Sequence, residues 1–242
     1  THETAIMEIM TVVHGIHYLS RHLRRWMRPQ RRHVALHFQP ARSYVVYQPL
    51  GVVGVMAPWN YPLALALMPL ATALAAGNRV MIKPSEHTPA ASALLERMLS
   101  ELFSPAQVAV IQGDAALGAA FAALPFDHLV FTGSTTVGRA VMKAAAEQLV
   151  PVTLELGGKS PVVIERGHAA AAAAGIAYGK LANAGQTCVA PDYVLLHDSD
   201  VEPFVAAFDV AVQRLYPEGP ASEDYTSIVD DRHYRRLLAL LE

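Results

Sequence analysis

The sequence predicts an α/β protein built on a parallel sheet whose faces are covered by helices. Short, wholly apolar runs alternate with helical runs through the middle of the chain. Such strands carry no polar face, so both of their faces must be buried. With 242 residues, 52% of them hydrophobic and 17% charged, the chain supports a substantial core in one large or two smaller domains.

The N-terminal segment, residues 1–28, is predicted to be helical, because apolar residues recur at helical spacing and no proline precedes Pro29. His14 and His17 lie three residues apart there, but no third ligand follows at a defined spacing, so we expect no metal site. From Val34 to Tyr47 the pattern is β-like. This region also contains a basic cluster of Arg21, Arg24, Arg25, Arg28, Arg31 and Arg32. We interpret the cluster as the solvated face of a helix rather than as a binding site for a polyanion.

Four strand–helix pairs follow. The expected strands are 51–57, 79–83, 108–111 and 128–132, and the expected helices are 63–76, 89–102, 115–124 and 135–148. Gly77 and Asn78 form a typical C-cap pair after the first of these helices. Parallel sheets bind ligands at the carboxyl ends of their strands. The residues with chemical potential fall at such ends: Asn60, Lys83, Glu86, Gly133 and Ser134.

A second unit is predicted to begin after Glu155, with the turn Gly157-Gly158 as the boundary. Its expected strands are 161–164 and 193–197, after a strand at 152–155, and its expected helices are 169–183 and 201–216. The chain opens at Thr1 rather than Met and ends within a leucine-rich helical run, residues 234–242. We therefore expect it to be a segment of a longer protein.

Composition excludes several classes of function. The net charge is −2, which gives no case for binding nucleic acid or a membrane surface. The longest apolar stretch, residues 63–76, has about 14 residues and is too short to span a bilayer. A single cysteine excludes a disulfide scaffold and fits a reducing compartment, so we expect a cytoplasmic protein.

That single cysteine, Cys188, has two interpretations. A free cysteine often serves only as a small buried packing residue. Here, however, Gly185, Gln186 and Thr187 form a short polar turn before it and Pro191 follows closely. Such a turn places the thiol on a loop at the end of an element, where reactive groups tend to lie. A nucleophilic cysteine requires partners from elsewhere in the chain.

Two residues elsewhere in the chain could be such partners. Asn60 lies in Pro58-Trp59-Asn60-Tyr61-Pro62, where its amide could donate a hydrogen bond to a developing oxyanion, or could simply form a turn. Glu155 ends an apolar strand, where burying a carboxylate is costly. It could act as a general base, or it could bond only to the adjacent glycine amides.

Two further stretches could bind a nucleotide. In residues 131–138 a strand ends, Gly133 permits close backbone approach, and a helix begins after Ser134, which suits a phosphate or pyrophosphate but also fits an ordinary helix cap. Lys83 could reach ribose or phosphate oxygens and Glu86 could accept from ribose hydroxyls. The alternative for this pair is an exposed lysine and a glutamate near a helix start.

Together these segments resemble the aldehyde dehydrogenase superfamily over roughly residues 45–215. The matching motifs, in the family's order and approximate spacing, are P-W-N-Y-P at 58–62, K-P-S-E at 83–86, F-T-G-S-T at 131–135, L-E-L-G-G-K at 154–159 and G-Q-T-C at 185–188. The continuation V-A-P-D-Y is similar to the class 3 branch. Residues 22–33 and 47–54 are similar to bacterial coniferyl aldehyde dehydrogenases.

The resemblance implies a role for each matching residue. Cys188 would attack the aldehyde, forming a thiohemiacetal and then a thioester. Asn60 and the Cys188 backbone N–H would hold the oxyanion, and Glu155 would activate the water that releases the acid. Cofactor contacts are implied for Lys83, Glu86, Gly133, Ser134, Trp59, Gly138 and Leu156. The charge of Glu86 should disfavour a 2′-phosphate, so NAD is expected, with NADP possible.

The resemblance also implies a Rossmann-like NAD-binding domain with an N-terminal helical segment at residues 1–156. A truncated α/β catalytic domain would follow at 157–242, incomplete at its C-terminus. The family's distal E-[IV]-F-G-P motif does not occur in the chain. We expect an aromatic, coniferyl-type aldehyde as substrate, no metal, and a homodimer of the full-length protein. The alternatives are a coenzyme A-acylating dehydrogenase and an inactive fragment or structural relative.

Overall fold

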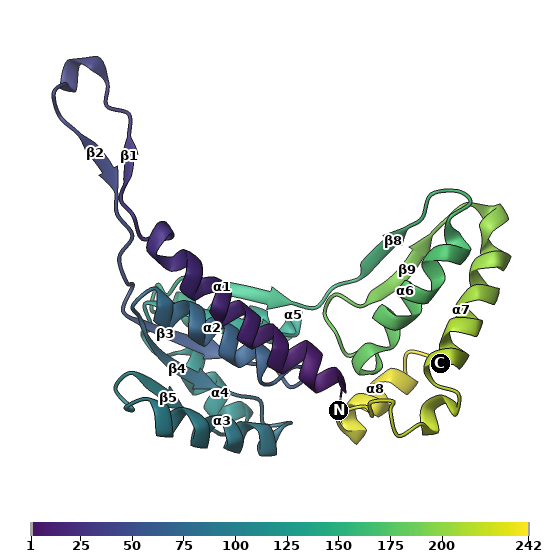
Figure 1. The fold of residues 1–242 in the computed structure, drawn as a ribbon. Coiled ribbons are helices and arrows are strands. Elements are labelled where there is room, and N and C mark those ends of the chain that lie inside the picture. Colours follow the sequence, from purple (N-terminus) through teal and green to yellow (C-terminus); the bar gives the residue numbers. More distant parts are fainter. Residues whose placement is uncertain (1, 242) are drawn as a thin grey trace. The chain divides into compact units, whose positions relative to one another are not determined.

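The computed structural model, which describes residues 2–241, shows an α/β fold divided into two compact units (Figure 1). The first unit is Thr4–Glu155, and the second is Leu156–Glu242 together with Thr1–Glu3. The predicted fold class is confirmed, because a parallel sheet and alternating helices form the first unit and a second α/β segment follows. No helix among the described residues is long and apolar enough to cross a membrane.

A five-stranded sheet in the order β5-β4-β3-β6-β7 organises the first unit. The strands are β3 (Val52–Met56), β4 (Arg79–Lys83), β5 (Val108–Val110), β6 (His128–Gly133) and β7 (Val152–Leu156). The central strand β3 runs parallel to both β4 and β6, and Met56 is level with Lys83 on one side and with Phe131 on the other. This register brings the carboxyl ends of three strands to the same edge of the sheet.

The helices between these strands supply the apolar side chains that bury the sheet. They are α2 (Ala64–Ala75), α3 (Pro89–Leu102), α4 (Ala115–Ala122) and α5 (Thr135–Ala146). Val55 of β3 and Ile82 of β4 share one core cluster with Leu70 of α2 and Leu95 of α3. Because β3 and β4 are buried on both faces, they contain almost only apolar residues, which is why the sequence pattern located them correctly.

Asn78 fixes the connection between α2 and the sheet. Its buried side chain accepts hydrogen bonds from the backbone N–H groups of Leu50 (2.7 Å) and Gly51 (3.0 Å) and donates one to the Ala73 carbonyl (3.1 Å). Gly77, with φ of +85°, makes the left-handed turn that ends the helix. The predicted C-cap pair is confirmed, and Asn78 also aligns the start of β3.

The N-terminal region differs from its prediction. The predicted helix 1–28 begins at Thr1, which lies outside the described residues, and is observed as a π-helix, Thr4–Met10, followed by α1, Thr11–Trp26. The predicted β-like stretch 34–47 yields only the short strand β2 (Ser43–Val45). It pairs antiparallel with β1 (Gln30–Arg32), which the sequence did not reveal because its residues are all polar and exposed.

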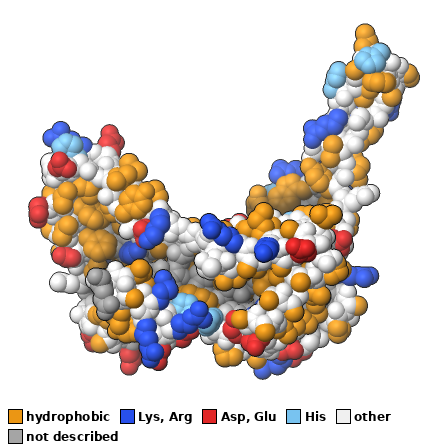
Figure 2. Space-filling model, turned by 180° about the vertical axis from the view of Figure 1, so that it is seen from behind, with side chains coloured by type: hydrophobic (Ala, Val, Ile, Leu, Met, Phe, Trp, Pro, Cys, Tyr) orange, Lys and Arg blue, Asp and Glu red, His pale blue; other side chains and the backbone are white. Residues whose placement is uncertain are grey.

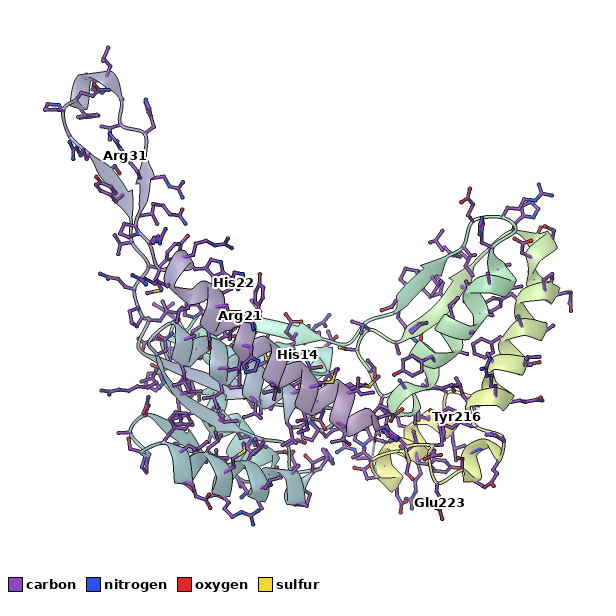
Figure 3. The ribbon with its side chains drawn as sticks, viewed as in Figure 1. His14, Arg21, His22, Arg31, Tyr216 and Glu223 are labelled. Atoms are coloured by element: carbon purple, nitrogen blue, oxygen red, sulfur yellow. The ribbon has the colours of Figure 1, made fainter. Side chains whose placement is uncertain are left out.

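The hairpin formed by β1 and β2 projects from its unit and exposes large side chains at its tip (Figure 2). Leu36 is 81% exposed and Phe38 is 63% exposed. The six clustered arginines are all exposed, but only Arg21, Arg24 and Arg25 lie on α1, whereas Arg31 and Arg32 belong to β1, so the helix-face interpretation holds for half of the cluster. Arg21 and His14 lie along α1 (Figure 3). His14 and His17 belong to no group of three or more potential metal ligands among the described residues.

The second unit is a smaller βαβ arrangement. Its strands β8 (Ser160–Val163) and β9 (Pro191–Leu195) are parallel and joined through α6 (Ala169–Leu181). Helix α7 (Val201–Leu215) packs against α6, and α8 (Asp231–Leu238) follows. The predicted helix 169–183 ends two residues early, because Ala182 has an extended ψ of 131° that cannot continue an α-helix. The predicted run to Glu242 extends beyond the described residues.

The core cluster predicts a cost for truncating Leu95, which is fully buried between α3 and the sheet. Replacing Leu95 by Ala should destabilise the first unit by about 2–5 kcal/mol, since lost burial and the residual cavity add together. Leu102 ends the same helix but is 68% exposed, so Leu102→Ala is the matched control. Urea unfolding of both variants checks this expectation, and equal effects would contradict the core assignment.

Candidate active site

The Asn60 loop follows β3 at the shared sheet edge, and a carboxylate holds its far end. Glu8, only 7% exposed, accepts hydrogen bonds at Oε2 from the backbone N–H groups of Leu63 (2.7 Å) and Ala64 (3.1 Å). These N–H groups lie at the start of α2, where they have no partner within the helix and where negative charge is favourable. Pro58 is buried before the loop, and Trp59 and Asn60 are half-buried. Asn60 therefore lies on a short segment anchored on both sides.

Lys83 and Glu86, both proposed as cofactor contacts, form an ion pair with each other. The Lys83 Nζ to Glu86 Oε2 distance is 2.5 Å, and the side chain of Lys83 is 6% exposed whereas that of Glu86 is 38% exposed. The exposed-lysine alternative is therefore wrong, because Lys83 ends a buried strand beside α4. A buried ammonium requires a partner, and Glu86 supplies it.

The pairing also shifts the titration of Glu86. Burial alone would raise the pKa of this carboxyl, but the hydrogen bond from Lys83, a backbone hydrogen bond and the charge of Lys83 together hold the pKa below its ordinary value. Glu86 is therefore ionised at neutral pH. Glu86 lines a cavity in this ionised form, which is the form that accepts hydrogen bonds from sugar hydroxyls.

A cavity of about 190 Å³ adjoins this pair. Its lining comes from the loop after β4, the start of α3 and the loop after β5: Pro84, Ser85, Glu86, Pro89, Ser92, Gln112 and Gly113. Sequence reasoning found only Glu86 among them. Ser92 donates to the Ser85 and Thr88 carbonyls, each at 3.0 Å, and so braces the cavity wall. Serine in the first turn of a helix was the available signal, but that pattern is too common to identify a site.

The turn between β6 and α5 has the geometry of a helix cap. Ser134 is the N-cap of α5, and its Oγ accepts a hydrogen bond from the Val137 N–H at 3.3 Å. A Cβ at Gly133 would lie 2.6 Å from the Phe131 ring, so a larger residue would displace that side chain. The cap interpretation is confirmed. The phosphate contact stays a prediction, as does the cofactor role of the buried Gly138.

Glu155 is exposed, whereas its place at the end of an apolar strand led us to expect burial. The cause is the position of β7 at the edge of the sheet, where exposed and half-buried residues alternate along the strand. Its carboxylate consequently carries no large desolvation cost. Leu156, the next residue, is half-buried and begins the second unit.

Cys188 is exposed and lies on a tight turn, so the interpretation as a buried packing residue is wrong. The turn is closed by the Ala190 N–H, which donates to the Thr187 carbonyl at 3.1 Å. Before it, Asn183, Ala184 and Gly185 all have positive φ, at 52°, 53° and 73°. A Cβ built on Gly158 would lie 3.5 Å from the Cys188 carbonyl oxygen, which places the G-G-K turn beside the cysteine.

The structure thus brings part of the predicted site together. Lys83 and Glu86 are in direct contact, and the common register of β3, β4 and β6 places Asn60, Lys83 and Gly133 at one sheet edge. Asn60 and Glu155 belong to the first unit, whereas Cys188 belongs to the second. The joint action of these three residues stays a prediction.

Known proteins supply the remaining evidence on identity. A family model described as "Aldehyde dehydrogenase family" matches residues 1–242. The chain belongs to the aldehyde dehydrogenase family. It is 55% identical over 241 residues to a "Probable coniferyl aldehyde dehydrogenase" of Pseudomonas aeruginosa, covering 99% of this chain and 51% of that protein. It is 47% identical over 236 residues to a "Coniferyl aldehyde dehydrogenase" of a Pseudomonas species, covering 97% and 49%.

Solved structures of the family agree with the fold. The substrate-bound state of Staphylococcus aureus AldH matches with a TM-score of 0.93 and 40% identity, covering 99% of this chain and 53% of that one. A Mycobacterium tuberculosis aldehyde dehydrogenase complexed with NAD⁺ matches with a TM-score of 0.86 and 31% identity, covering 99% and 50%. The chain spans about half the length of the curated relatives it matches.

The depressed pKa of Glu86 predicts a pH dependence of stability. A carboxyl whose folded pKa lies below its unfolded value contributes stability above the unfolded pKa, about 4.3 for glutamate, and loses it as the pH falls through the folded pKa. Glu86→Gln should therefore melt at a lower temperature than the parent at pH 7, and this gap should close on acidification below about pH 4.

Melting curves from pH 7 to pH 3 check this expectation. Glu101→Gln is the matched control, because Glu101 is exposed on α3 in the same unit. A gap of constant size at every pH would show that Glu86 does not stabilise the fold through its charge.

Proposed function

We propose that the whole protein oxidises an aldehyde to the carboxylic acid, using Cys188 as the nucleophile and NAD as the hydride acceptor. The observation that carries this proposal is the exposed thiol of Cys188 on its turn, in a chain of the aldehyde dehydrogenase family. Exposure is what a nucleophilic cysteine needs and a packing cysteine lacks. The sequence also contains Asn60 and Glu155, the residues assigned to oxyanion binding and to water activation.

The reaction begins when the Cys188 thiolate attacks the aldehyde carbon and forms a C–S bond. The carbonyl oxygen becomes an oxyanion, which the amide of Asn60 and the backbone N–H of Cys188 stabilise. Loss of hydride from the thiohemiacetal leaves a thioester on Cys188. Glu155 then takes a proton from water, the resulting hydroxide attacks the thioester, and Cys188 leaves as a thiolate with release of the acid. The exposure of Glu155 supports this role, since its carboxylate is open to water.

The described residues fit a dinucleotide at the edge of the sheet. Glu86 supplies ionised oxygens beside the cavity, and the buried Lys83 fixes its position. Backbone N–H groups at the start of α5, after Gly133, offer an anion site next to Ser134. Trp59, Gly138 and Leu156 complete the proposed contacts. When bound, NAD or NADP supplies the acceptor for the hydride. The charge of Glu86 favours NAD, because a 2′-phosphate would be repelled.

The substrate we propose is an aromatic aldehyde of the coniferyl type. The support is the identity of 55% and 47% to proteins described as coniferyl aldehyde dehydrogenases. A homodimer and a cytoplasmic location stay predictions from the sequence. Glu155 argues against the coenzyme A-acylating alternative, because a thiol acceptor needs no base that activates water. Adding coenzyme A and testing for an acyl-CoA product separates the two reactions.

Cys188→Ala in the whole protein tests the nucleophile. This change removes the atom that forms the C–S bond, so NADH production from aldehyde should fall to background. Binding of NAD, measured by calorimetry, should stay within about twofold, because the proposed cofactor contacts are unchanged. Oxidation near the parent rate would refute the proposal, and an inactive parent protein would favour the non-catalytic alternative.

Glu155→Gln tests the general base. The amide keeps the size of the side chain but cannot accept a proton from water, so thioester hydrolysis should slow by about 10²–10⁴-fold. The rapid formation of NADH in the first turnover should persist, since thiol attack and hydride loss precede hydrolysis of the thioester. Stopped-flow absorbance measures both phases, with Glu165→Gln as an exposed control in the second unit. Loss of the rapid phase would assign Glu155 to an earlier step.

A further inference from the structure

The loop that carries Cys188 has a backbone that its own sequence does not favour. Asn183 and Ala184 adopt left-handed conformations, with φ, ψ of 52°, 33° and 53°, 32°, and Gly185 follows with φ of 73°. Glycine adopts this region freely and asparagine tolerates it, but alanine does not. Non-glycine residues in this region are strained and persist only where surrounding contacts hold them.

Gln186 makes those contacts through its side-chain amide. Its Nε2 donates to the Asn183 carbonyl at 2.9 Å and to the Ser227 carbonyl at 3.1 Å. Its Oε1 accepts from the Val229 N–H at 3.0 Å. One side chain therefore closes the left-handed turn and ties it to residues 227–229. Both donors and the acceptor are used, which is a pattern that a carboxylate or an apolar side chain cannot reproduce.

A second bridge joins the same two segments. Glu3 accepts at Oε1 from the Asn183 N–H (3.2 Å) and at Oε2 from the Thr226 hydroxyl (2.7 Å). The ring of Tyr216 (Figure 3) packs edge-on against Tyr225, with ring centroids 4.7 Å apart. The segment that Gln186 holds is thus itself packed and can serve as a fixed support for the loop.

We propose that Gln186 is a positioning residue for Cys188: its amide holds the left-handed turn against residues 227–229 and so sets the direction of the thiol and backbone N–H two residues later. This inference rests on the proposed function of Cys188. Gln186 touches neither substrate nor reacting atoms in this role. A misplacement of a nucleophile by about 1 Å is enough to cost about 10²-fold in rate.

Two substitutions of Gln186 in the whole protein test the roles of its amide donors and its amide acceptor. Gln186→Met removes the donors and the acceptor, whereas Gln186→Glu keeps an acceptor for the Val229 N–H but places negative charge against the Asn183 and Ser227 carbonyls. We expect kcat to fall about 10²-fold in the first variant and at least about tenfold in the second. The KM for NAD should stay within about twofold in both, because all the proposed cofactor contacts except Leu156 lie in the first unit.

Hydrogen exchange of the amides supplies a readout that needs no catalysis. The Val229 N–H should exchange at least about tenfold faster in Gln186→Met, because its acceptor is gone, and at close to the parent rate in Gln186→Glu. Gln213→Met and Gln213→Glu are the matched controls. Gln213 is exposed on α7 in the same unit, so neither kcat nor exchange should change.

The outcomes distinguish this inference from the proposed function. If Cys188→Ala still oxidises the aldehyde, the proposed function is refuted. Exchange of the Val229 N–H then still reports whether its hydrogen bond to Gln186 exists. If Cys188→Ala is inactive but both Gln186 variants keep kcat within about threefold and remain folded, the positioning role is overturned. If both variants unfold by circular dichroism, Gln186→Asn is compared, and loss of folding there too assigns Gln186 to stability instead.

Discussion

The parallel register of β3 with its two neighbours is the constraint on which the first unit depends. Because Met56 is level with both Lys83 and Phe131, the three strands end side by side, which places Lys83, Gly133 and the loop of Asn60 at one edge of the sheet. Hydrogen bonds along β3 fix this alignment, and a slip of one residue would exchange the side chains that pack on the two faces of the sheet, so that none would meet its present partners. The register is therefore maintained by the same apolar burial that builds the core.

Buried elements were predictable from the sequence, and the reason is physical. The strands and helices from β3 to α5 lie within two residues of their expected bounds, since a fully buried strand permits few residue types. Strand β2 lies within the stretch predicted to be β-like, but its partner β1 was not predictable, because its residues are all polar and exposed. Asn78 was located as a cap, but its two bonds to the start of β3 depend on tertiary contacts.

The candidate site shows the same division. Strand ends and glycine turns identified the positions of Lys83, Glu86 and Ser134, whereas the environment of each could not be inferred from the pattern. Glu155 is the clearest case, because an apolar run suggested burial and the edge position of β7 exposes the carboxylate. Lys83 is the converse, a charged residue buried because Glu86 compensates it. Exposure depends on a strand's neighbours, which local sequence does not encode.

Two distant parts of the chain hold the cysteine loop: Glu3 near the beginning, and residues 227–229 well after the loop. Glu3 precedes Asn183 by 180 positions, and Val229 follows Gln186 by 43. During synthesis the loop emerges while Glu3 is present but residues 227–229 are not. The left-handed turn lacks its Gln186 partners in that interval. The left-handed turn therefore gains the last of these contacts only once residues 227–229 have been synthesised.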